Sequence, residues 1–232
     1  MHFANRTVVV TGGTGALGAA VVGMLLEHEA RCIVPYVNET EMQRFAHRGH
    51  KSVTLVGVRD LADEADVGEL YAQAGSSLWA SIQVAGGYAP GKVADTDKTA
   101  LMAQIEQNLV SCFLCCRAAV NAMGKNGGRI VNVAARPALE PRTGAGMSAY
   151  TVAKNGVAAL TAALAEEVAK DGILVNAVAP SIMDTPANRA AMPKADFARW
   201  PKVEEVAATI VFLASADNHV TRGAIVPVYG KS

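Results

Sequence analysis

The sequence predicts an α/β protein with a doubly wound parallel sheet, and three observations predict it. Strand-like and helix-like segments alternate along the whole chain, as in repeated βαβ units. Several strand-like segments are almost purely apolar, which is typical of parallel strands covered by helices on both faces. The 232 residues include 51% hydrophobic and 18% charged side chains, which suits one domain with a sizeable core. We therefore expect a single domain over residues 1–232, with its ligand beyond the carboxyl ends of the strands.

The expected elements follow one another in a regular order. Apolar and β-branched runs predict strands near 7–11, 31–36, 52–57, 78–85, 129–134, 173–179 and 224–228. Apolar residues at helical spacing predict helices near 16–28, 39–48, 62–74, 97–123, 149–170 and 203–214. The stretch near 181–202 has no regular pattern and follows the sixth strand. A loop of this length inside a compact domain is usually functional, so we expect a substrate loop there.

The junction of the first strand and the first helix is rich in glycine. Gly13, Gly15 and Gly18 fit the pattern G-x-G-x-x-G directly after an uncharged, β-branched run. Such a turn brings bare backbone against a pyrophosphate, and the helix that follows offers unpaired N–H groups and the positive end of its dipole. The junction therefore predicts a dinucleotide site made by Gly12, Gly13, Thr14, Gly15, Ala16, Leu17 and Gly18.

The segments after the second and third strands bear on the adenosine half of such a cofactor. NAD-binding folds often place an acidic residue after the second strand, where it hydrogen-bonds the ribose. Tyr36 stands at that place here. The turn has no basic residue to hold a 2′-phosphate, which favours NAD slightly, while Arg44 on the next helix leaves NADP open. Asp60 is expected at the adenine, although it would serve nearly as well as a helix cap.

Tyr150 and Lys154 are the candidate catalytic residues. They stand four residues apart at the start of an expected helix, so their side chains project from the same face. A nearby ammonium group lowers the pKa of a phenol through its charge. Such a pair can give a proton to a substrate atom that receives a hydride, and the lysine can also bind a ribose.

Together these motifs resemble the short-chain dehydrogenase/reductase family over essentially the whole chain. Asn108 and the segments 84–87 and 176–180 match further motifs of the family. The resemblance implies a single-domain Rossmann fold with NAD or NADP as the cofactor. It adds Asn108 to Tyr150 and Lys154 as a catalytic residue that supports the lysine. It also implies further cofactor contacts at Leu61, beside Asp60 at the adenine, and at Ala85, Gly86, Gly87, Val133, Pro180, Ile182 and Thr185.

One position departs from the family pattern. The fifth strand of the family normally ends in a serine that hydrogen-bonds the substrate carbonyl, and the aligned residue here is Ala135. The dihydropteridine reductase branch of the family is similar to this chain at that position, at the aromatic Tyr88 and in the loop around Arg189. This resemblance implies reduction of a quinonoid dihydropterin, which does not need the serine. Ala135, Tyr88 and Arg189 are then the expected substrate contacts, with Tyr88 stacked on the flat ring.

Charge and cysteine content argue against several other classes of function. The 21 basic and 21 acidic side chains cancel, and no basic stripe indicates nucleic acid or an anionic membrane as a partner. No apolar stretch is long enough to span a membrane, and the N-terminus enters a strand without a signal region. Cys112 and Cys115 have C-x-x-C spacing, but no second pair or nearby histidine completes a metal site. We expect a cytoplasmic protein with buried free thiols and no metal.

The sequence leaves three functions open. The first is NAD(P)-dependent reduction of a small molecule, such as a dihydropterin, with Tyr150 as the proton donor. The second is a carbonyl or 3-oxoacyl reductase in which another hydroxyl replaces the serine. The third, motivated by Ala135, is a dinucleotide-binding redox sensor without catalysis. Helices 97–123 and 149–170 carry small and apolar residues on more than one face, so we expect a homodimer or a homotetramer.

Overall fold

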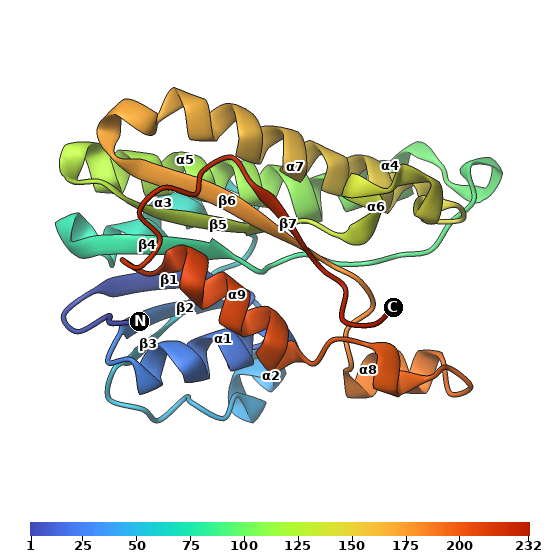
Figure 1. Cartoon of the computed structure of the whole chain (residues 1–232), viewed down its shortest axis with the longest axis horizontal. Helices are drawn as coiled ribbons and strands as arrows, with labels where there is room; N and C mark the ends of the chain where they lie inside the picture. Colours follow the sequence, from blue (N-terminus) through green and yellow to red (C-terminus); the bar gives the residue numbers. More distant parts are fainter.

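A parallel sheet of seven strands, in the order β3-β2-β1-β4-β5-β6-β7, runs through the middle of the molecule (Figure 1). The computed structural model describes every residue from 1 to 232. The strands are β1 (Thr7–Thr11), β2 (Arg31–Tyr36), β3 (Val53–Gly57), β4 (Leu78–Gln83), β5 (Gly128–Val133), β6 (Ile173–Pro180) and β7 (Ile225–Val228). The order of the chain reverses between β1 and β4, and such a switch point opens a crevice that can take a ligand.

Helices cover both faces of this sheet (Figure 1). One face carries α1 (Ala16–Glu27), α2 (Glu39–Arg44) and α9 (Val203–Ala214). The other carries α3 (Glu64–Ala72), α4 (Lys98–Ile105), α5 (Ser111–Met123), α6 (Arg136–Leu139) and α7 (Ser148–Glu167). Each face has its own apolar core, with 22 buried residues on the side of α1 and α9 and 24 on the side of α5 and α7. The expected doubly wound α/β fold is confirmed.

The helix expected over 97–123 is interrupted where it passes the sheet. Its middle, Glu106–Val110, forms a single π-helical turn between α4 and α5. Asn108 is buried in this turn, where its Nδ2 donates to the carbonyl oxygens of Gly87 (2.9 Å) and Gln104 (3.0 Å). The extra residue of a π turn is common at functional sites, and here it aims Asn108 at the end of β4.

The segment 181–202 is more regular than its sequence indicates. It contains the short helix α8 (Pro186–Ala191), whose first turn is capped by the Thr185 hydroxyl, and a 3₁₀ turn at Phe197–Arg199. Its two ends are held together, because the Asp184 N–H donates to the Pro201 carbonyl at 2.9 Å. The segment leaves the body of the domain beyond the end of β6 (Figure 1), where a substrate loop is expected.

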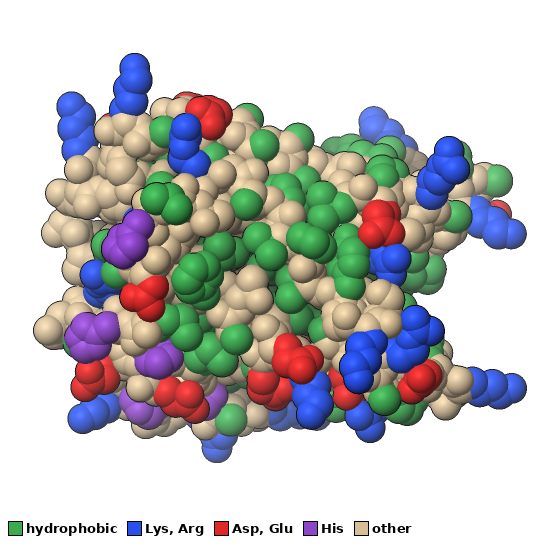
Figure 2. Space-filling view, in the orientation of Figure 1, with side chains coloured by type: hydrophobic (Ala, Val, Ile, Leu, Met, Phe, Trp, Pro, Cys, Tyr) green, Lys and Arg blue, Asp and Glu red, His purple; other side chains and the backbone are tan.

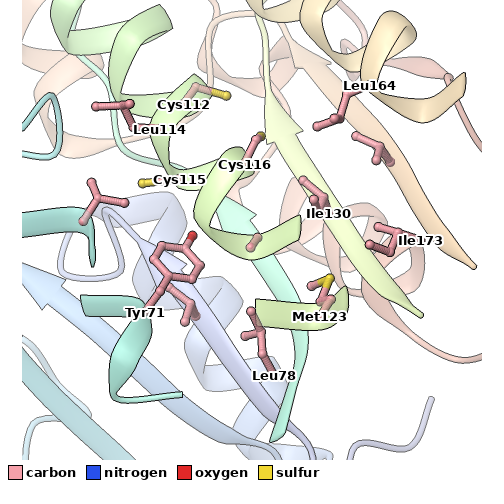
Figure 3. Close-up of a cluster of buried hydrophobic side chains, with 14 of the residues drawn as sticks. Tyr71, Leu78, Cys112, Leu114, Cys115, Cys116, Met123, Ile130, Leu164 and Ile173 are labelled. Carbon is pink, nitrogen blue, oxygen red and sulfur yellow. The ribbon is translucent and has the colours of Figure 1, made fainter. Parts of the chain in front are cut away.

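The four cysteines are buried free thiols. Figure 3 shows Cys112, Cys115 and Cys116 projecting from α5 among apolar side chains of the larger core. Burial raises the pKa of Cys115 to about 12, so this thiol stays protonated and unreactive at neutral pH.

The outer surface mixes charges of both signs. On the face shown in Figure 2, basic and acidic side chains are interspersed around the rim, and apolar side chains gather nearer the centre. No helix combines the length and the apolar composition that a membrane crossing requires.

Candidate active site

A cleft of about 850 Å³ runs across the carboxyl ends of the strands. It is lined by most of the residues that the sequence singles out, which come from separate stretches of loop, strand and helix. They are Gly12, Thr14, Gly15, Ala16, Leu17, Gly18, Asp60, Leu61, Ala85, Gly86, Gly87, Tyr88, Asn108, Val133, Ala135, Tyr150, Lys154, Pro180 and Thr185. The cleft lies at the switch point of the sheet, where this class of fold binds its ligands.

The glycine turn has no room for side chains. A Cβ atom on Gly18 would lie 2.1 Å from the Gly12 carbonyl oxygen, and one on Gly12 would lie 2.7 Å from the Ala85 nitrogen. Gly12 also has a φ of +64°, which favours glycine. The turn therefore packs directly on the start of α1 and on the end of β4.

The start of α1 is open to the cleft. Gly15 is its N-cap and provides no side-chain hydrogen bond, and the N–H groups of Ala16, Leu17 and Gly18 have no acceptor within the protein. Unpaired N–H groups and the positive end of the helix dipole suit a phosphate group. This end of the cleft thus fits the diphosphate of a dinucleotide.

Beyond the turn, the cleft continues between the ends of β2 and β3. The Asp60 carboxylate accepts a hydrogen bond from the Ala62 N–H at 2.8 Å, whereas Asp63 and not Asp60 caps α3. Glu41, on α2, lines this end although no sequence motif indicated it. Its carboxylate accepts a hydrogen bond from the Thr14 hydroxyl at 3.3 Å.

Tyr150 and Lys154 lie on the first turns of α7 at the other end of the cleft. Lys154 is only 5% exposed, and its Nζ donates to the Val133 carbonyl at 2.8 Å. Burial lowers the pKa of Lys154 to about 8. The Nζ atom lies 5.9 Å from the centre of the Tyr150 ring, so the expected pair is on one helix face.

The pKa of Tyr150 differs from the expectation that the lysine would lower it. Burial, and secondarily the neighbouring Tyr88 phenol, raise the pKa of Tyr150 to about 12. Removal of the phenol from water disfavours the phenolate more than the ammonium group at this separation favours it. Tyr150 is therefore a protonated phenol at neutral pH.

Asn108 and Lys154 converge on the same backbone. A Cβ atom on Gly86 would lie 2.6 Å from the Asn108 Oδ1 and 3.3 Å from the Lys154 Nζ. Asn108 Oδ1 also accepts a hydrogen bond from the Gly87 N–H at 3.2 Å. Gly86, in the segment that follows β4, must be glycine for these two side chains to meet over it.

The substrate end has an aromatic wall and lacks the serine. Ala135 lines the cleft as the residue before α6 and offers no side-chain hydrogen bond. Tyr88 is 58% exposed, and its ring stands edge-on to Tyr150 with ring centres 5.2 Å apart. Ser148 and Thr143, the nearest hydroxyls in the sequence, do not line the cleft.

Four predicted site residues lie outside the cleft. Tyr36 pairs with Gly57 in the sheet and its hydroxyl lies over that glycine, because alternate residues of a strand face opposite sides. Gly13 faces the Val34 side chain of β2 and not the cleft, so a side chain at this position would clash with that valine. Ile182 is exposed outside the cleft. Arg189 is bound to the Asp184 carboxylate through two hydrogen bonds of 2.6 and 2.7 Å.

Sequence reasoning missed several cleft residues, which lie after β2 and β3, on α2, from α4 to the start of α5, and after β6 as far as α8. They include Val37, Glu41, Arg59, Ala103, Glu106, Gln107, Ser111, Ser181, Met183 and Asn188. Gln107 packs against the Cα of Gly87. It directly precedes Asn108, and this position beside a predicted site residue could have indicated it. For Glu41 the signal was its position in the helix that follows β2.

The fold and this cleft define an oxidoreductase of the dinucleotide-binding α/β class. The family model described as short chain dehydrogenase matches residues 6–196. The chain is 35% identical to a cis-4-hydroxycyclohexanecarboxylate dehydrogenase of Sinomonas cyclohexanicum, over 98% of this chain and 96% of that protein. It is 31% identical to the (2S)-[(R)-hydroxy(phenyl)methyl]succinyl-CoA dehydrogenase subunit BbsD of Thauera aromatica, over 99% and 97%.

A solved structure agrees with these relatives. An oxidoreductase of the short-chain dehydrogenase/reductase family from Burkholderia thailandensis superposes with a TM-score of 0.87 at 25% identity, over 97% of this chain and 91% of that one. The protein belongs to the short-chain dehydrogenase/reductase family and is an NAD(P)-dependent oxidoreductase. This assignment favours an enzyme over the non-catalytic sensor that Ala135 had suggested.

Proposed function

We propose that the protein reduces a planar conjugated imine and that its substrate is a quinonoid dihydropterin. The observation that carries the proposal is Ala135, which places a methyl group where a ketone reductase of this family has a hydroxyl donor. One such donor contributes about 3 kcal/mol to a developing oxyanion in a buried site. A conjugated C=N system takes its proton on nitrogen, so the loss of a donor to a carbonyl oxygen costs it little.

The roles of the site residues follow from their geometry. The cofactor supplies a hydride when it is bound. Tyr150 holds the accompanying proton on its phenol oxygen, because a pKa of about 12 keeps it protonated at neutral pH. Lys154, oriented by the Val133 carbonyl, is placed to bind ribose hydroxyls. Asn108 holds the Gly87 peptide at the floor of the cleft.

Tyr88 supports a flat substrate. Its ring is largely exposed at the mouth of the cleft and stands next to the proton donor. An aromatic ring there offers a surface on which a conjugated bicycle can stack. Phenylalanine should replace Tyr88 with little loss, whereas alanine should weaken substrate binding and raise KM.

A carbonyl reductase is the second candidate function. It is favoured by the relatives, since the Sinomonas protein is named for a hydroxycyclohexane carboxylate and the Thauera protein for a hydroxy(phenyl)methyl compound. Such an activity would require another donor at the position of Ala135. The Tyr88 hydroxyl is the available candidate beside Tyr150.

Nicotinamide oxidation by the purified protein tests the proposal. NADH and NADPH would be offered separately with a quinonoid dihydropterin generated in the assay, and in parallel with a cyclohexanone carboxylate. We expect turnover of the pterin that Tyr150→Phe abolishes and that Tyr229→Phe, outside the cleft, leaves intact. Turnover of the ketone alone would replace the pterin with a carbonyl substrate.

We also propose that NAD is the preferred cofactor, that the protein works in the cytoplasm and that it is a homo-oligomer. The four free thiols support a reducing compartment. Phe113 on α5 and Val152 on α7 are 50% and 55% exposed, which supports an interface through these two helices. Light scattering of the wild type and of Val152→Asp tests the proposed homo-oligomer, since a dimer through α7 should dissociate in the variant.

A further inference from the structure

We propose that Glu41 on α2 makes the cofactor site selective for NAD(H) by repelling the 2′-phosphate of NADP(H). The inference rests on the nicotinamide cofactor of the proposed function and deepens it, because it assigns the residue that reads the adenosine ribose. No motif indicated Glu41, and the selectivity comes from a helix rather than from the end of β2.

The end of β2 provides no acidic group for this purpose. Tyr36 is the last residue of the strand, and its hydroxyl lies over Gly57 on the neighbouring β3. The flanking Pro35 and Val37 face the cleft, but both are apolar. A carboxylate that reaches this end of the cleft must therefore come from another element, and Glu41 does so.

Two contacts hold Glu41 in place. The Asn38 side chain caps α2 by accepting hydrogen bonds from the N–H groups of Thr40 (2.8 Å) and Glu41 (3.4 Å). The Glu41 carboxylate in turn accepts a hydrogen bond from the Thr14 hydroxyl at 3.3 Å. Thr14 belongs to the glycine turn, so the carboxylate bridges α2 and the turn beside the path from the diphosphate site to Asp60.

No free positive charge compensates Glu41 at this end. Arg59 also lines the cleft, but its Nε and Nη2 donate to the Asp66 Oδ1 at 3.1 and 2.8 Å. Asp60 adds a second carboxylate to the lining, and Arg44 of α2 lies outside it. A ribose hydroxyl can donate a hydrogen bond to the Glu41 carboxylate, whereas a 2′-phosphate would bring like charges together in the same place.

Calorimetric titration of the protein with NAD⁺ and with NADP⁺, without substrate, tests this role. We expect the wild type to bind NAD⁺ at least tenfold more tightly. Glu41→Gln keeps the shape and removes the charge, and should strengthen NADP⁺ binding about tenfold at low salt. Glu39→Gln is the matched control, because Glu39 lies in the same helical turn but outside this cleft; it should leave the ratio of the two dissociation constants unchanged.

The outcomes separate this inference from the proposed function. An unchanged ratio in Glu41→Gln, or an equal change in Glu39→Gln, would overturn the role of Glu41 while the cofactor assignment stands. Equal binding of both cofactors by the wild type would also overturn it. If the protein bound neither NAD⁺ nor NADP⁺, the role of Glu41 and the proposed function would both be overturned. A ratio that changes in Glu41→Gln and not in Glu39→Gln, without pterin turnover, would support the role of Glu41 and remove only the pterin.

Discussion

Lys154 illustrates at the scale of one residue how a buried charge in the proposed active site works against stability. Its ammonium group is buried in the native protein and its pKa falls from 10.5 to about 8. Between these two values the unfolded chain binds more protons than the native one, so native stability rises with pH across this window. Below about pH 8, burial of the ammonium group lowers the free energy of unfolding by its full amount, about 3 kcal/mol.

Lys154→Met should therefore stabilise the protein while it impairs the enzyme. The variant removes the buried charge but leaves the Val133 carbonyl without its donor, which takes back about 1 kcal/mol. We expect urea unfolding near pH 7 to show a gain of about 1–2 kcal/mol, and the gain to vanish near pH 10. Lys170→Met, at an exposed site, is the control. A loss of stability at both pH values would show that the ammonium group is not strained by burial.

Ala135→Ser should restore what the family normally has. The residue stands at the N-cap of α6 without a side-chain hydrogen bond, so a serine there should add about 0.5–1 kcal/mol of stability. Its hydroxyl would also face the cleft beside Tyr150, where a donor raises carbonyl reduction about 10²-fold. We expect kcat/KM to rise for ketones and to change little for the pterin.

The matched control for this substitution is Ala138→Ser, on the same helix but outside the cleft. Ala138→Ser should change kcat/KM for neither the ketones nor the pterin. A fall in ketone turnover in Ala135→Ser would mean that this position excludes substrate by volume rather than by the missing hydrogen bond.

At the scale of elements, the glycine turn could be read from the sequence because its constraint is local. Gly18 must lack a side chain for the start of α1 to pack on the turn, and the spacing of the glycines in the sequence indicates this requirement. Gly18→Ala would put a methyl group 2.1 Å from the Gly12 carbonyl oxygen, whereas the same change at Gly15 meets its nearest atom at 3.4 Å.

Unfolding of the two variants without cofactor measures this difference. Gly18→Ala should lose about 3 kcal/mol or more because backbone must move, as for other overpacked sites. Gly15→Ala should change stability by less than about 0.5 kcal/mol. Equal effects of the two substitutions would contradict the packing that the turn shows.

Other elements could not be predicted from the sequence, because contacts between residues far apart in the chain determine them. In the π turn, Asn108 donates to the Gly87 carbonyl in the segment that follows β4, and no helical periodicity in the sequence indicates such a contact. Tyr36 is expected at the cofactor because its place at the end of β2 fits the pattern, but its hydroxyl lies over Gly57 and its side chain does not line the cleft. The side chains of Tyr150 and Lys154 lie on one helix face as predicted, yet the degree of burial that sets their pKa values depends on the whole cleft.

At the scale of the molecule, one sheet with a core on each face should unfold as one unit. Leu25 on α1 is fully buried in the smaller core and Leu70 on α3 in the larger one. Alanine at either position should cost about 2–5 kcal/mol, depending on how far the cavity collapses. The strands between the two cores transmit the loss, so each variant should lower the midpoint of a single transition.

Two probes distinguish this cooperativity from separate unfolding of the two layers. Trp79 lies in β4 at the centre of the sheet, and Trp200 lies near the end of the segment 181–202 beside Phe197, with ring centres 5.0 Å apart. Helix content by circular dichroism and tryptophan fluorescence should trace the same denaturation curve in the wild type and in both variants. If Leu25→Ala shifted only one of two resolved transitions, the two layers would be independent folding units.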